Sequence, residues 1–282
     1  MDVEGAVVEL LRRASTVLPD DVADALERAR GSESRPVART QLDNIIENHR
    51  LARERSLPMC QDTGVHVFWV IGCDDDVEEA IRAGVRRATS EVPLRPNAVD
   101  PITRHNPGDN VGEGIPVIHR LPGEGLEITV MPKGAGSENM SRMAMLNPAD
   151  GMDGVMRFVL DAVTGAGGKP CPPTIVGVGV GGTSDECMAM AKRALLRPLD
   201  VEGHDPELAS LESRLTEALN ATGVGPMGLG GDTTVLGTRV ERGHCHTASL
   251  PVAVCMQCWA ARRATVRVTE EGHGFLEAPS WI

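Results

Sequence analysis

The most constraining feature of this chain is the stretch at residues 243–263, GHCHTASLPVAVCMQCWAARR. Its centre, residues 250–254, is a short apolar run bounded by polar residues, and this pattern predicts a buried strand. Thiol and imidazole side chains stand at both ends of the run: His244, Cys245, His246, Cys255 and Cys258. Such groups at the ends of one stiff element can hold a metal. We therefore expect further ligands to come from elsewhere in the chain.

Composition restricts both the core and the class of partner. Aromatic residues make up 2% of the 282 residues and tyrosine is absent, so the core has to be built from Ala, Val, Leu, Ile and Met. Forty acidic residues against 28 basic ones give a net charge of −12. An acidic surface repels a phosphate backbone, and the chain lacks the aromatic side chains on which bases stack. We expect no nucleic-acid partner.

The sequence also carries signals about compartment. No apolar run approaches the roughly 18–20 residues of a membrane helix, and the acidic start MDVEGAVVELLRRA does not look like a signal peptide. We expect a cytoplasmic protein without a membrane segment. Seven cysteines in such a chain are thiols rather than disulfides, and each is either a small buried apolar residue or a metal ligand. For Cys73 and Cys187 we expect the buried role.

Hydrophobic periodicity predicts an α+β (mixed α/β) fold in one domain over residues 1–282. Residues 1–55 form a helical N-terminal segment of three helices, and strands and helices then interleave. The expected strands are 65–71, 126–130, 174–180, 233–240 and 250–254. The expected helices are 77–89, 150–164, 184–196 and 206–220. Residues 91–125 are expected to be irregular, and the segment after residue 258 is either a helix start at 258–263 or a strand at 265–269.

A glycine pattern at the end of one predicted strand needs separate treatment. Gly177, Gly179 and Gly182 match G-x-G-x-x-G between a strand and a helix, as in dinucleotide-binding folds. Such a site also requires an acidic residue after a second strand about 20 residues further on, and residues 197–200, RPLD, follow no predicted strand. A dinucleotide site is therefore the least favoured of three interpretations. The other two are close packing of the strand on the helix, or a substrate anion at the helix N-terminus.

Three cysteines occupy positions where the chain changes direction. Cys60, Cys171 and Cys258 are flanked by proline, glycine or polar residues, so each can present a thiolate to a shared cavity. A structural zinc site made of residues 244, 246, 255 and 258 fits poorly, because the apolar run leaves few residues in which to turn back. Three thiolates suit a [4Fe–4S] cluster that leaves one iron open for a substrate.

Four motifs carry a resemblance to a known family: PMCQDTG at 58–64, KGAGSEN at 133–139, PCPPTIVGVGVGGTSD at 170–185, and the opening stretch at 243–263. They resemble, in order and over nearly the whole chain, the α-subunit or N-terminal domain of class I iron–sulfur fumarate hydratases and the related L-tartrate dehydratases. The resemblance implies a pocket that holds a [4Fe–4S] cluster with one open iron through Cys60, Cys171 and Cys258. Cys245 and Cys255 fall outside the pattern, with Cys255 expected to face the core.

The same resemblance implies the residues around the substrate. His246 and Asp62 are expected to be catalytic, with Asp62 polarising the histidine. The residues expected to bind substrate are Gln61, Arg104, Lys133, Gly134 and Gly136. The lysine and the two glycines follow a predicted strand, where main-chain N–H groups can approach an anion closely.

The resemblance further implies a hydro-lyase that reversibly dehydrates a small 2-hydroxy dicarboxylate. Malate to fumarate is the first expectation and L-tartrate to oxaloacetate the second, with mesaconate and citramalate also in the substrate class. The proton-abstracting residue is expected on a separate β-subunit, in an α2β2 assembly or with a homodimer of this chain. The alternative function is an iron–sulfur redox-sensing or binding module without catalysis of its own.

Overall fold

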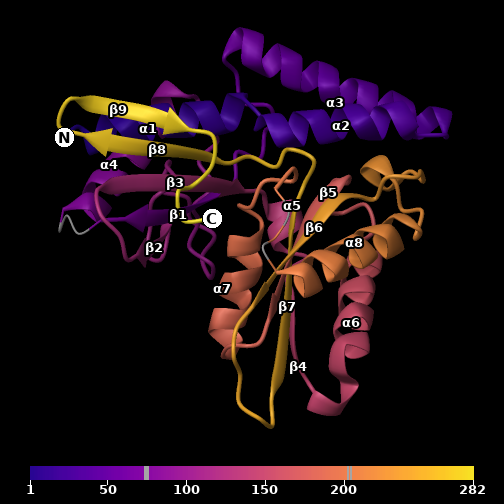
Figure 1. Ribbon diagram of the computed structural model, residues 1–282. Coiled ribbons are helices and arrows are strands. Elements are labelled where there is room, and N and C mark those ends of the chain that lie inside the picture. Colours follow the sequence, from indigo (N-terminus) through magenta and orange to yellow (C-terminus); the bar gives the residue numbers. More distant parts are fainter. Residues whose placement is uncertain (73–75, 202, 204) are drawn as a thin grey trace. The chain divides into compact units, whose positions relative to one another are not determined.

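The computed structural model describes residues 1–72, 76–201, 203 and 205–282 (Figure 1). Three helices come first, and strands then interleave with helices, which confirms the predicted α+β class. The first helix is fixed at its start by Asp2, whose Oδ1 accepts the Gly5 N–H at 2.8 Å. The N-terminal helices are α1 (Val3–Thr16), α2 (Asp20–Ser32) and α3 (Pro36–Arg55).

The chain divides into two compact units, each assembled from separate stretches of sequence. Unit 1 comprises residues Met1–Pro19, Glu47–Ala135 and Arg262–Ile282, and unit 2 comprises Asp20–Ile46 and Gly136–Ala261. The single domain over residues 1–282 stays a prediction, because a division into compact units does not show whether they fold separately.

Unit 1 is built on a five-stranded sheet with the order β2-β1-β3-β8-β9. β1 and β2 pair in parallel, and the other neighbouring strands are antiparallel. Helices α1 and α4 pack together, and their apolar faces join Phe68, Val70, Ile128 and Val130 in one buried core. The elements introduced here are β1 (Val65–Ile71), α4 (Val77–Glu91), β2 (Val117–Leu121), β3 (Leu126–Lys133), β8 (Ala264–Thr269) and β9 (Gly272–Leu276).

Unit 2 contains a four-stranded sheet with the order β4-β7-β5-β6, in which β5 and β6 are parallel. Helix α7 lies on one face of this sheet, and α6 and α8 lie on the other (Figure 1). The larger elements of the unit are β4 (Arg142–Leu146), α6 (Gly151–Ala166), β5 (Thr174–Val180), α7 (Ser184–Ala194), α8 (Pro206–Asn220), β6 (Val235–Arg242) and β7 (Leu250–Gln257). Three short helical turns complete the description: α5 (Ala135–Glu138), η1 (Pro148–Asp150) and η2 (Pro226–Gly228).

Strand alternation decides what each face of this sheet contacts. Val176 and Val178 of β5 belong to the core shared with α6 and α8, so Gly177 and Gly179 point to α7. A Cβ on Gly177 would lie 2.1 Å from the Ala191 carbonyl oxygen, and one on Gly179 equally close to a carbonyl oxygen of the same helix. These glycines therefore serve the packing of α7 on the strand.

The main-chain amides of Gly181 and Gly182, directly after β5, are hydrogen-bonded within the chain. Gly181 donates its N–H to the Pro251 oxygen at 2.9 Å, and Gly182 donates to the His244 oxygen at 3.1 Å. Because both N–H groups bind carbonyl oxygens of the chain, they are not presented to an anion. The structure therefore supports close packing for Gly177 and Gly179, while a substrate anion at the N-terminus of α7 stays a prediction.

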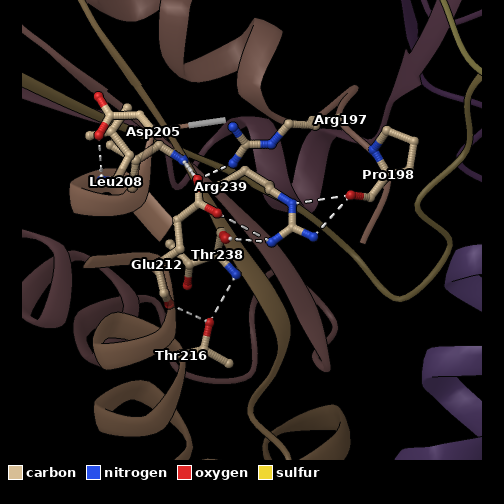
Figure 2. Close-up of polar contacts among 9 residues, drawn as sticks. Arg197, Pro198, Asp205, Leu208, Glu212, Thr216, Thr238 and Arg239 are labelled. Carbon is tan, nitrogen blue, oxygen red and sulfur yellow. Dashed lines mark hydrogen bonds and ion pairs between the residues drawn. The ribbon is translucent and has the colours of Figure 1, made fainter. Parts of the chain in front are cut away.

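Helix α8 also closes the outer edge of β6 (Figure 2). Thr216 Oγ1 accepts the Thr238 N–H at 3.1 Å, and Glu212 Oε1 accepts the Val240 N–H at 2.7 Å. Residues four apart on a helix thus cover amides two apart on the strand. Glu212 additionally pairs with Arg197 and Arg239. The edge is therefore blocked against pairing with another strand.

Three strands were not predicted from the sequence, and all three are sheet edges: β2, β4 and β9. Each is at most half-buried along most of its length, so it lacks the apolar run that marks a central strand. β2 lies inside the segment expected to be irregular. After residue 258 the chain forms the strand β8, which settles that alternative.

Two cysteine predictions concern the core. Cys187 is fully buried on α7, as predicted, while Cys73 lies outside the described residues.

Among the helices that the structure describes, none combines the length and the apolar character that spanning a membrane requires.

His66 on β1 is a buried imidazole with a strongly perturbed pKa. The side chain is fully buried, and neither ring nitrogen has a hydrogen-bond partner among the described residues. Burial first, and the nearby Arg262 charge second, lower the pKa of His66 to about 3. In the folded protein, the His66 ring is therefore neutral near pH 7.

We predict an acid-sensitive component of stability that depends on His66. Between about pH 3 and 6.5 the unfolded chain binds the proton that folded His66 rejects, so stability rises with pH through this window. The loss amounts to roughly 1 kcal/mol for each pH unit below 6.5 and ends near pH 3. Urea unfolding of the wild type and His66→Leu at pH 6.5 and 4.5 measures it. Equal pH slopes for the two proteins would contradict the assignment.

Candidate functional site

The six described cysteines differ in solvent exposure. Cys60, Cys171 and Cys258 are all half-buried, whereas Cys187 and Cys255 are buried. Cys255 points toward α7, with its Sγ 3.4 Å from Met188 Sδ and 3.6 Å from Ser141 Oγ, so it faces the core as predicted. Cys245 is exposed, and its Sγ donates to the Ser249 oxygen at 3.2 Å. The three predicted cluster ligands therefore have the same intermediate degree of exposure.

Cys171 has an unusual backbone that the surrounding chain holds in place. Its φ is +55°, in the left-handed region that non-glycine residues rarely adopt. Its N–H donates to the Gly168 oxygen at 3.1 Å, and its carbonyl oxygen accepts the Trp259 N–H at 3.1 Å. The second bond joins Cys171 to the residue directly after Cys258. Two predicted ligands that are distant in sequence are thus tied together within unit 2.

Cys60 lies in unit 1, at the start of a tight turn that Asp62 organises. Asp62 Oδ1 accepts the Gly64 N–H at 3.0 Å, and Oδ2 accepts the Ala135 N–H at 2.7 Å. The carboxylate therefore fixes the turn internally and also fastens it to the chain after β3. Charge-assisted bonds of this kind are stronger than neutral ones.

A buried arginine that the sequence reasoning left without a role holds the same turn. Arg262 is 1% exposed, and its Nη1 donates to the Asp62 carbonyl oxygen at 2.9 Å. A Cβ on Gly134 would lie 3.3 Å from Asp62 Oδ2 and 3.6 Å from Arg262 Nη2. Gly134 therefore lies against both groups. Arg262 is the last residue of CWAAR, residues 258–262 of the motif at 243–263.

The turn opens onto a hollow of about 670 Å³ in unit 1. Its lining includes Cys60 and Gln61 and also Arg95, which the sequence reasoning missed. Thr63 Oγ1 donates to the Arg95 oxygen at 3.2 Å, and Asn97 Nδ2 donates to the Gly64 oxygen at 3.2 Å. These bonds fasten the Arg95 segment to the turn. Arg95 lies in the stretch expected to be irregular, so no periodic pattern marked it.

The remaining predicted substrate-binding residues belong to different elements. Arg104 is exposed on a loop, with a φ of +61° and its N–H bonded to the Asp100 oxygen at 2.9 Å, and it does not line the hollow. Lys133 is 1% exposed at the end of β3. Gly136 lies in unit 2, where a Cβ would be 3.0 Å from the Lys169 oxygen. Their roles toward a substrate stay predictions.

His246 is exposed in the loop before β7, and its tautomer is defined. Its Nδ1 accepts the Ala248 N–H at 3.1 Å, so the proton of the neutral ring lies on Nε2. The ring therefore presents an N–H donor outward. A carboxylate could pair with the neutral ring only through Nε2, and polarisation by Asp62 stays a prediction.

The donor set suits an iron–sulfur cluster chemically. There is no disulfide among the six described cysteines, and the three predicted ligands are half-buried thiols, one on a backbone held rigidly by its neighbours. Across the described residues, no three His, Cys, Asp or Glu side chains are grouped as a metal site. The predicted set is divided, with Cys60 in unit 1 and the other two in unit 2.

Replacing Asp62 by asparagine is predicted to loosen the turn. One amide oxygen can still accept from Gly64, but the NH₂ group then faces the Ala135 N–H, so one donor loses its acceptor. We expect a loss of about 1–3 kcal/mol in the free energy of unfolding, measured with urea. Asp161→Asn, the same change at an exposed position on α6, is the control. Equal stabilities for the two variants would refute the fastening role.

Comparison with known proteins agrees with these observations. The family described as fumarate hydratase (Fumerase) matches residues 4–267. A Methanocaldococcus jannaschii protein, provisionally named L(+)-tartrate dehydratase subunit alpha, is 50% identical over 95% of this chain and 98% of its own length. The L(+)-tartrate dehydratase subunit alpha of Escherichia coli UTI89 is 35% identical over 90% of this chain and 86% of its own, and that of strain K12 is 34% identical. The chain belongs to the fumarate hydratase family, as its four motifs predicted.

Proposed function

We propose that this chain is the cluster-carrying α-subunit of a hydro-lyase that dehydrates a small 2-hydroxy dicarboxylate. The hydro-lyase class follows from family membership and confirms the predicted type of enzyme. The observation that carries the finer proposal is the hydrogen bond between Trp259 N–H and Cys171 O, which joins Cys171 to the residue directly after Cys258. Both cysteines are half-buried and are expected to bind the cluster. Names of relatives favour L(+)-tartrate as the first substrate, and the family name favours malate and fumarate as the second.

The proposed cluster ligands are Cys60, Cys171 and Cys258. A [4Fe–4S] cluster with three thiolates keeps one iron open, and that iron supplies a Lewis acid for the substrate hydroxyl. Thiolates bind the cluster and thiols do not, so an environment of intermediate exposure suits them better than the apolar sites of Cys187 and Cys255. Burial raises the pKa of Cys187 to about 11, which keeps that residue a thiol.

The hollow in unit 1 is the proposed place for part of the dicarboxylate. Arg95 offers a forked pair of donors that matches a carboxylate, and Gln61 offers an amide that can bind a hydroxyl. We add Arg95 to the proposed substrate-binding residues beside Gln61, Arg104, Lys133, Gly134 and Gly136. A dianionic substrate needs several such partners, because an unpaired carboxylate is costly to remove from water.

His246 is proposed to act on the oxygen that leaves. In dehydration, the bond between C2 and its hydroxyl breaks, a proton passes from C3 to a base, and the hydroxide takes up a proton and leaves as water. The base later releases the C3 proton, so that one water is lost overall. The Nε2–H that His246 presents can donate to this oxygen. The base that removes the C3 proton is proposed to come from the β-subunit, a partner that the designation "subunit alpha" of the relatives implies.

The principal alternative is an iron–sulfur redox-sensing module without catalysis of its own. It shares the same three ligands and predicts no turnover with any dicarboxylate. The assembly as α2β2 or as an α homodimer, and the cytoplasmic compartment, also remain proposals.

The ligand set is tested by anaerobic reconstitution of serine variants with iron and sulfide. We expect Cys60→Ser, Cys171→Ser and Cys258→Ser each to lose most of the bound iron and sulfide, because each removes one of three thiolates. Cys255→Ser and Cys245→Ser serve as controls in the core and at the surface, and should load as the wild type does. A full cluster in Cys60→Ser together with its loss in Cys255→Ser would disprove the set.

Catalysis is tested with the reconstituted chain alone and in complex with its β-subunit. We expect turnover of L(+)-tartrate by the complex, weaker turnover of malate, and little by the isolated chain, since the base for C3 is absent there. Mesaconate and citramalate complete the panel. Robust turnover by the isolated chain would refute the shared site, and a loaded complex that acts on no member of the panel would favour the redox module.

A further inference from the structure

The glycine-rich stretch at residues 223–231, GVGPMGLGG, has no role in the proposed chemistry, yet it contacts the loop that carries Cys171. Met227, in the turn η2, donates its N–H to the Pro172 oxygen at 2.7 Å. Its φ of +54° is left-handed, as is that of Cys171. A residue with a left-handed backbone thus binds the residue directly after Cys171. Strain of this kind persists only where the surroundings impose it.

A close contact between two glycines fixes the other side of the loop. A Cβ on Gly228 would lie 2.5 Å from Gly168 Cα, and one on Gly168 would lie 3.1 Å from both Gly228 Cα and the Met227 oxygen. Gly168 is also the residue whose carbonyl oxygen accepts the Cys171 N–H. The glycine-rich stretch therefore packs against Gly168, the residue that accepts the hydrogen bond from the Cys171 N–H.

The stretch is itself held at both ends. Gly225 donates its N–H to Thr234 Oγ1 at 3.1 Å, and Asp232, directly after the stretch, donates to the Glu33 carboxylate at 2.9 and 3.1 Å. Glu33 is fully buried. Asp232 Oδ2 in turn accepts the Ser34 N–H at 2.7 Å. A loop with so many glycines would be flexible alone, and these bonds make it a fixed support.

We infer that residues 223–231 are a buttress that sets the left-handed backbone of Cys171 and so aims its thiol at the cluster. Met227 and Gly228 are positioning residues: neither is proposed to bind the cluster, and both act through the Gly168–Pro172 segment. The inference rests on the proposed role of Cys171 as a ligand. It predicts that the buttress governs how readily the cluster is loaded and how firmly it is held.

The chain offers a matched pair of substitutions. Gly228 and Gly223 both have positive φ, +74° and +68°, so alanine strains the backbone at either position. Only Gly228 faces Gly168, whereas a Cβ on Gly223 has no atom of the described chain within 4 Å. Gly168→Ala is a milder third variant, with contacts of 3.1 Å and no left-handed backbone. The expected order of effect is Gly228→Ala, then Gly168→Ala, then Gly223→Ala.

Two measurements on the full chain read out the effect. In the cluster-free chain, the rate of Cys171 alkylation by iodoacetamide, followed by mass spectrometry, should change on the order of tenfold in Gly228→Ala relative to Gly223→Ala. In the reconstituted chain, with and without the β-subunit, Gly228→Ala should bind less iron and sulfide and release them faster in air. The electron paramagnetic resonance spectrum of the remaining cluster, recorded after one-electron reduction, should shift as well.

The outcomes separate the buttress from the ligand assignment. Equal alkylation rates and equal loading in Gly228→Ala and Gly223→Ala overturn the buttress. If Gly228→Ala does not fold, judged by its thermal transition, Gly168→Ala decides by the same two readouts. A full cluster in Cys171→Ser overturns the ligand assignment instead. In that case the buttress is not expected to affect cluster loading. The alkylation rates of the glycine variants still report on the Cys171 backbone.

Discussion

The hydrogen bond from Trp259 N–H to the Cys171 carbonyl is the constraint on which the candidate site depends. It joins the end of the segment after β7 to the loop before β5, and it holds Cys171 in a conformation that its side chain disfavours. Neighbouring groups complete the restraint, since the Cys171 N–H and the Pro172 carbonyl are both engaged by glycine-rich segments. A backbone fixed in this way limits where the Cys171 thiol can lie, which suits the proposed role as a cluster ligand.

The glycines of the G-x-G-x-x-G pattern allow α7 to pack closely on β5. Gly177 and Gly179 let the carbonyl oxygens of α7 approach β5, and the amides of Gly181 and Gly182 bind carbonyl oxygens of the chain. The G-x-G-x-x-G spacing arises here because alternate residues of one strand meet one helix. The motif was ambiguous in sequence because both uses require the same absence of a Cβ.

Much of the fold could be predicted, and the failures have a common cause. Central strands such as β1 and β5 are buried on both faces, so their apolar runs are continuous and visible. The edge strands β2, β4 and β9 are only partly buried and have no such signature. Cys255 shows the same logic within a strand, because its alternation with Val254 fixes which face it meets.

By itself, the sequence determined the helical N-terminal segment, the central strands, the α+β class and the family, because each depends on local periodicity or on short motifs. The tertiary structure alone decided that Arg95 joins Gln61 at one hollow, that Arg262 holds the Asp62 turn, and that the Ala248 amide sets the tautomer of His246. It also decided that the glycine-rich stretch contacts the loop that carries Cys171. Most of these contacts join residues far apart in the chain, and all depend on backbone geometry that no periodic pattern of side chains encodes.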